Sequence, residues 1–193
     1  MHKLRVEMFS DGVIAVIITI LVLELHAPEG AEWRDLTPLL PDFLGYVLTF
    51  VYLGIYWSNH HHMLQAAEHV NGAVLWANLH LLFWLSLTPF ATRWMGDHPF
   101  ATIPIILYGF DLLFAAIAYS ILERTLIGAQ GAGSALKMAV GTDIKGWVSI
   151  ACYVVGIIAA FAGFGWLGLL LYAVVALMWL VPDRRIERVL GRK

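Results

Sequence analysis

Residues 5 to 25 read RVEMFSDGVIAVIITILVLEL, and this stretch decides the fold of the chain. From Val13 to Leu23 every residue except Thr19 is apolar, and no charge follows until Glu24. Residues at i, i+3, i+4 and i+7 of a helix share one face. On this segment one such face carries Gly12, Val16, Thr19, Ile20, Leu23 and Ala27. A stripe of this kind serves either as a packing seam or as the wall of a pore.

The composition of the whole chain indicates an integral membrane protein. Hydrophobic residues make up 60% of the 193 residues and charged residues 13%, against roughly 25% charged in ordinary soluble domains. The formal net charge of −2 does not point to a polyanionic partner such as nucleic acid. The single cysteine, Cys152, lies in an apolar run, which excludes a disulfide framework and a cysteine-rich metal site.

The first apolar segment follows Lys3 and Arg5, as the apolar segment of a signal peptide would. Glu7 and Asp11 interrupt the basic region, and no small-x-small cleavage site follows Leu25. We therefore expect a retained first membrane span.

About 20 apolar residues are needed to cross the hydrocarbon core as a helix. On that basis the sequence predicts one domain over 1–193, an all-α membrane protein with six spans. The predicted spans are 6–26, 37–62, 72–95, 101–124, 144–163 and 166–182. Turn-forming residues separate them, and Gly128 to Gly133 is expected to form a flexible linker after the fourth.

The distribution of Lys and Arg predicts that both termini are cytoplasmic. With the N-terminus inside, ten basic residues lie on the inner side and two on the outer side. The inner ones are Lys3, Arg5, Arg124, Lys137, Lys145, Arg184, Arg185, Arg188, Arg192 and Lys193, and the outer ones are Arg34 and Arg93.

The fifth and sixth predicted spans are rich in small residues, but the chain shows no internal repeat. Gly156 with Ala160, and Ala159 with Gly163, form small-xxx-small pairs that allow helices to approach closely. Packing within the chain is favoured over a seam between subunits.

Ionisable residues inside spans are candidate functional groups by default. Asp11 lies one turn inside the first span, within helical reach of Arg5 and Ser10, and serves either as a hydrogen-bonded anchor or in ion attraction and gating. Glu24 is near the outer end, where its carboxylate can reach water. Asp111 is deeper in the fourth span and is expected to pair with another helix through a histidine or tryptophan.

The run His60-His61-His62 does not predict a metal site. Consecutive helical residues point about 100° apart, and a zinc site needs three or four converging ligands. His61 and His80 could ligate a haem between two spans, but no second such pair exists. The favoured interpretation is a buried polar network that meets Asp11 and Arg5 at the inner interface. Its expected members are Trp57, Asn59, Asn78, Asp111 and one or two of the histidines, His60 and His61.

The sequence contains no nucleophile elbow, phosphate loop or dinucleotide fingerprint in a workable context. We therefore expect neither an enzyme nor a cofactor.

The start of the first span resembles the signature of the transmembrane protein 175 family of potassium channels, in its bacterial branch. The signature residues are Arg5, Phe9, Ser10 and Asp11, followed by a helix containing Thr19. Further similar positions are Tyr56-Trp57 before His60-His61, and Asn78 with Pro89-Phe90. The six-span plan extends this resemblance over essentially the whole chain.

The resemblance implies a homotetramer in a bacterial inner membrane, with a central pore lined by the first helix of each subunit. It implies rings of bulky apolar side chains as the constriction, in place of a carbonyl filter. Mapped from Asp11, these layers fall on Val16, Ile20 and Leu23, with Thr19 beside the first. Relatives often carry leucine or isoleucine in the innermost layer, so the shorter Val16 would widen that ring or move the tightest point toward Ile20 or Leu23.

The resulting hypothesis is a potassium-selective cation leak channel, holding potassium only in transit, with an apolar gate that closes by dewetting. Two other classes stay open. A proton-coupled secondary transporter would use Asp11, Asp111 and the histidines as a relay, because histidine titrates near neutral pH. A non-transporting assembly protein would use the stripe of the first helix only as a seam.

Overall fold

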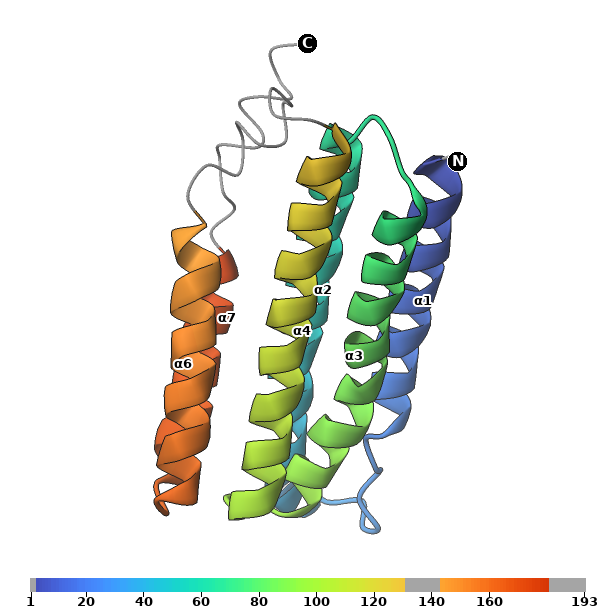
Figure 1. Ribbon diagram of the computed structural model, residues 1–193. Coiled ribbons are helices and arrows are strands. Elements are labelled where there is room, and N and C mark those ends of the chain that lie inside the picture. Colours follow the sequence, from blue (N-terminus) through green and yellow to red (C-terminus); the bar gives the residue numbers. More distant parts are fainter. Residues whose placement is uncertain (1–2, 131–142, 181–193) are drawn as a thin grey trace.

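A computed structural model describes residues 3–130 and 143–180 of the chain. This part contains six long helices and a short 3-10 helix, η1, and it contains no strand. The elements are α1 Lys3–Leu23, η1 Trp33–Leu39, α2 Leu40–Ala66, α3 Gly72–Asp97, α4 Thr102–Gln130, α6 Ile144–Phe161 and α7 Gly165–Leu180 (Figure 1). The prediction of an all-α membrane protein is confirmed.

Five of the helical segments within the described residues are long and apolar enough to cross a membrane. The last helix, α7, is apolar but has 16 described residues, which span about 24 Å of a hydrocarbon core that is about 30 Å thick. The predicted sixth span ends at 182, outside the described residues. The chain is a multi-pass membrane protein.

The helix bounds lie within a few residues of the predicted spans. The first helix begins and ends three residues earlier than expected, at Lys3 and Leu23, so Ala27 lies beyond the helix that carries the other stripe residues. The second span is preceded by η1, and its helix continues to Ala66.

The linker predicted from Gly128 is wrong at its start, because α4 continues through Gly128 to Gln130. The Gln130 side chain explains this extension. Its Oε1 accepts hydrogen bonds from the backbone N–H groups of Glu68 (2.8 Å) and His69 (3.1 Å), and its Nε2 donates to the carbonyl of His69 (2.7 Å). A contact with the α2–α3 connection thus stabilises the last turn. Residues 131–133 of the expected linker lie outside the described part.

The helices run side by side, with the connections at two ends that Figure 1 draws as upper and lower. The upper end holds the start of α1 and the α2–α3 connection, and the lower end holds the segment after α1 and the α3–α4 connection. At one edge of the bundle, α1 packs on α2 and α3, while α6 and α7 pack together against α4 on the other side.

Two clusters of buried side chains form the core, and α2, α3 and α4 contribute to both. The first joins α1 to these helices through residues such as Ile14, Leu53 and Leu81. The second cluster joins α6 and α7 to the same helices, and it includes the neighbouring rings of Tyr108 from α4 and Tyr172 from α7. Helix α1 therefore packs on one side of the central helices α2, α3 and α4, and α6 and α7 pack on the other side.

Small residues let α6 and α7 approach closely. A Cβ added at Gly168 would lie 2.9 Å from the carbonyl oxygen of Gly156, and one added at Gly156 would meet the Tyr172 ring at 2.6 Å. The turn between the helices places Gly163 at φ 87°, and the Phe164 N–H donates to the Ala159 carbonyl, 2.9 Å away. This is a glycine-terminated helix end. Gly156 therefore serves the close packing of α6 on α7.

Candidate functional site

Helix α1 has two unlike faces. Val6, Ser10, Ile14, Ile17 and Leu21 are buried against α2 and α3. The opposite face carries the stripe defined from the sequence, and its apolar residues stand clear of the rest of the chain. Val16 is 56% exposed, Ile20 42% and Leu23 78%. A single subunit thus leaves these side chains uncovered at the edge of the bundle.

Thr19 lies on the same exposed face. Its hydroxyl donates to the Val16 carbonyl at 2.8 Å, one turn back along the helix. Because that bond uses its only hydrogen, the lone pairs of the hydroxyl oxygen are what Thr19 presents on the stripe. The stripe therefore combines apolar surface with one oxygen acceptor.

At the upper end of α1, a chain of three buried hydrogen bonds joins α1, α3 and α2. Ser10 Oγ donates to the Val6 carbonyl (2.8 Å), so it must accept from the Asn78 amide (2.9 Å). The Asn78 oxygen therefore faces His60 Nε2 at 2.7 Å, and the imidazole donates. All three side chains are buried. This arrangement defines the rotation of α1 relative to α3.

A second polar layer lies closer to the surface, between α1 and α2. Trp57 Nε1 donates to Asp11 Oδ1 at 3.1 Å, and Glu7 lies 3.3 Å from His61 Nδ1. The Trp57 and His61 rings are stacked, with 6.2 Å between centroids. The three consecutive histidines thus have different surroundings, and His62 Nδ1 is buried without a hydrogen-bond partner in the described structure.

Three residues that the sequence placed in or beside this network do not join it. Asn59 donates to the Ile55 carbonyl of its own helix at 2.9 Å. Arg5 is exposed and has no hydrogen bond or ion pair to another described residue, so it does not satisfy Asp11. The carboxylate of Asp111 is buried and lies beside the Thr88 hydroxyl of α3, and no hydrogen bond joins it to a histidine or tryptophan among the described residues. Asp111 therefore faces another helix, as expected, but through a threonine of α3 in place of the expected histidine or tryptophan.

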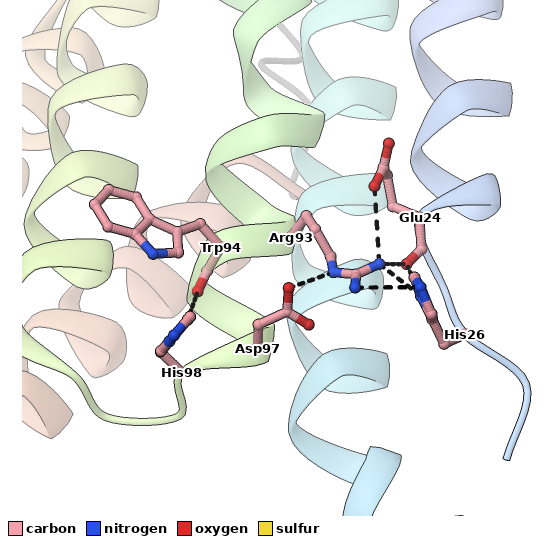
Figure 2. A network of polar contacts seen from close by, with 6 residues as sticks. All are labelled: Glu24, His26, Arg93, Trp94, Asp97 and His98. Carbon is pink, nitrogen blue, oxygen red and sulfur yellow. Dashed lines mark hydrogen bonds and ion pairs between the residues drawn. The ribbon is translucent and has the colours of Figure 1, made fainter. Parts of the chain in front are cut away.

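The lower end of α1 carries a polar cluster that the sequence reasoning missed (Figure 2). Arg93, in the last turns of α3, lies between Asp97 on its own helix and the residues that follow α1. Its Nε donates to Asp97 Oδ2 at 2.6 Å, and one terminal nitrogen donates to the Glu24 carbonyl at 2.5 Å. The spacing of Arg93 and Asp97 is a recognisable i, i+4 pair, whereas the link to Glu24 has no signal in the sequence.

His26 and the Glu24 carboxylate complete this cluster. His26 Nδ1 lies 2.6 Å from the Arg93 guanidinium, and because a guanidinium only donates, the histidine nitrogen accepts. The Glu24 carboxylate lies 3.8 Å away. Glu24, expected only to reach water, therefore contacts α3 through both its backbone and its side chain.

The described residues contain no group of three or more His, Cys, Asp or Glu side chains arranged to hold a metal ion. His80, considered as a haem ligand with His61, accepts a hydrogen bond from Trp84 Nε1 at 3.0 Å. The candidate site is thus the exposed stripe of α1 together with the polar contacts at its two ends.

The sequence of this chain is similar to those of several known proteins. Residues 5–89, which include nearly all of α1, the whole of α2 and most of α3, match the profile of the family described as endosomal/lysosomal potassium channel TMEM175. A curated protein of Chryseobacterium sp. (strain P1-3), named as a potassium channel, is 53% identical over 188 residues, which cover 97% of each chain. A second protein named as a potassium channel, from Streptomyces collinus, is 35% identical over 98 residues, which cover 49% of this chain and 48% of the Streptomyces protein.

The fold also matches a solved structure. The crystal structure of a homologue of the lysosomal potassium-selective channel TMEM175, from Chamaesiphon minutus, superposes with a TM-score of 0.78. The match covers 94% of this chain and 97% of that one, at 24% identity. This likeness shows that the arrangement of the helices is shared.

Proposed function

This chain belongs to the TMEM175 family, and from that premise we propose that it forms a potassium channel in which α1 of each subunit lines the pore. The observation that carries the proposal is the relative from Chryseobacterium, a named potassium channel that is 53% identical over nearly the full length of both chains. The relatives are named as channels, which also argues against an enzyme.

The two faces of α1 support the assignment of the pore. The buried face accounts for packing on α2 and α3, and it leaves Val16, Ile20 and Leu23 projecting away from the subunit. Four copies around a central axis would bring these residues into three successive rings. A narrow ring of apolar side chains excludes a continuous column of water and so stops conduction. Rotation of α1 would move these side chains into or out of the axis.

The proposed assembly is a homotetramer in a bacterial inner membrane, selective or weakly selective for potassium. The upper end in Figure 1 would face the cytoplasm, because the basic residues predicted to be inside include Lys3 and Arg5 at the start of α1. Lipid covers the faces that do not contact another subunit.

The relatives favour this channel over a proton-coupled transporter, because the bacterial proteins that this chain resembles are named as potassium channels. The same names favour a pore over a simple seam for the exposed stripe of α1.

Ion flux into liposomes that contain the purified protein tests the proposal. We expect passive potassium flux above sodium flux, following the ion gradient and independent of a proton gradient. Flux that saturates and requires a proton gradient would instead identify a transporter. A correctly inserted protein that passes no ion would leave the stripe as a seam. The mass of the detergent-solubilised complex tests the tetramer.

A further inference from the structure

The lower cluster contains one side chain that links the end of α1 to another helix. Arg93 lies in the last turns of α3, and its guanidinium donates to the backbone carbonyl of Glu24, the first residue after α1 (Figure 2). The backbone N–H of Glu24 donates to the Ile20 carbonyl at 3.3 Å, so Glu24 still belongs to the final helical turn.

The chemistry of a helix end explains why this contact is favourable. The last carbonyls of a helix lack partners and carry a partial negative charge, which a cationic donor complements. The Arg93 side chain is 25% exposed, so water weakens this interaction only in part. Asp97 binds Nε on the other edge of the planar guanidinium and holds it in the orientation that reaches Glu24.

The two ends of α1 are therefore both attached to α3. Asn78 holds Ser10 at the upper end, and Arg93 holds Glu24 at the lower end. Ser10 and Glu24 are 14 residues apart, about 21 Å along a helix, and Asn78 and Arg93 are 15 residues apart, about 22 Å. Because α1 and α3 run in the same direction, the two attachments match in spacing. Sliding or rotation of α1 must break at least one of them.

All of the stripe residues from Val16 to Leu23 lie between these attachments, and Leu23 is next to Glu24. We infer that Arg93 is a positioning residue, which fixes the rotation of the outer end of α1 and so determines where the Leu23 side chain points in the pore. This inference rests on the proposed function, since it assigns to Arg93 control of a constriction on α1.

Flux measurements on Arg93→Gln test the inference. The variant keeps a polar side chain but loses the positive charge and the guanidinium that bridges Asp97 and Glu24. We expect passive cation flux to rise and the potassium-to-sodium ratio to fall, each by about threefold or more, with Arg93→Lys closer to wild type. Arg34→Gln is the matched control, because Arg34 is exposed at the same end and pairs with Glu32 at 2.9 Å, away from α1.

A double-variant comparison separates positioning from a general loss of structure. If Arg93 acts through Leu23, then Arg93→Gln has no added effect on the flux ratio in a Leu23→Ala background. The same substitution keeps its effect in a Val16→Ala background. Full additivity with Leu23→Ala, or an Arg93→Gln protein with wild-type flux and ratio, would overturn the inference.

A labelling experiment gives a readout that does not require conduction. In a Cys152→Ser background, Leu23→Cys is labelled with a water-soluble thiol reagent, with and without Arg93→Gln. We expect the labelling rate to change by threefold or more, and an unchanged rate would contradict the positioning role. A wild-type protein without flux but with this change in labelling would refute the proposed channel alone. If Arg93→Gln does not insert, Asp97→Asn loosens the same guanidinium and replaces it in each measurement.

Discussion

The two ends of α1 are held by different kinds of interaction. At the upper end, neutral side chains from three helices form a short, buried chain through Ser10, Asn78 and His60. At the lower end, Arg93 and the carboxylates of Glu24 and Asp97 form a charged cluster that water reaches. A buried neutral network defines one geometry, because each unmet partner is costly. A charged contact near water is weaker and is screened by salt. The upper end of α1 is therefore fixed, whereas the contact between Arg93 and Glu24 at the lower end breaks more easily.

The largest effect is expected at the upper end, from Asn78→Ala. This change removes partners from both Ser10 and His60, so two buried groups lose a hydrogen bond. We expect the free energy of unfolding in detergent to fall by roughly 1–3 kcal/mol. Asn59→Ala is the matched control, because Asn59 donates only to the Ile55 carbonyl on its own helix. Equal unfolding midpoints for the two variants would show that the upper end does not fix α1.

Leu23→Ala and Ile20→Ala test the stripe between the two ends. A smaller side chain widens the proposed ring, so we expect higher flux and a lower potassium-to-sodium ratio, with little change in unfolding. Val22→Ala is the control, since Val22 is an exposed apolar residue of α1 outside the stripe. If the three variants conduct alike, with unchanged ion ratios, the stripe does not line the pore.

Asp11 and Trp57 test whether the outer layer at the upper end acts through a hydrogen bond or through charge. Asp11→Asn keeps an oxygen that accepts from Trp57 Nε1, whereas Trp57→Phe keeps the charge and removes the donor. We expect an anchor, so Asp11→Asn should retain assembly and conduction better than Trp57→Phe does. An Asp11→Asn protein that assembles normally but does not conduct would assign the carboxylate to ions or gating.

The smallest effect is expected from salt on the lower end. Arg93→Gln should lower the free energy of unfolding by about 0.2–1 kcal/mol at low ionic strength, and by less in 1 M salt, because the charged cluster is partly exposed. The loss caused by Asn78→Ala should not depend on salt. Unfolding curves of both variants at two salt concentrations check this difference. A salt-independent loss for Arg93→Gln would remove the contrast between the two ends.

The sequence predicted the class of protein, the approximate spans and the residues that share the stripe of α1. These features depend on the hydrophobicity of consecutive residues and on the period of the helix, which are local properties. The pairing of Asn78 with a histidine was also expected in outline, since polar residues in spans must find partners in one another.

Contacts between helices were decided only by the tertiary structure. Three features depend on which groups a neighbouring segment presents: the cluster around Arg93, the position of Asp111 beside Thr88, and the continuation of α4 to Gln130. That choice follows from the relative rotation and sliding of packed helices, which no local pattern encodes. Local chemistry thus determined which residues of α1 share a face, and the packing of α1 on α2 and α3 decided which face stays exposed and how each end of the helix is held.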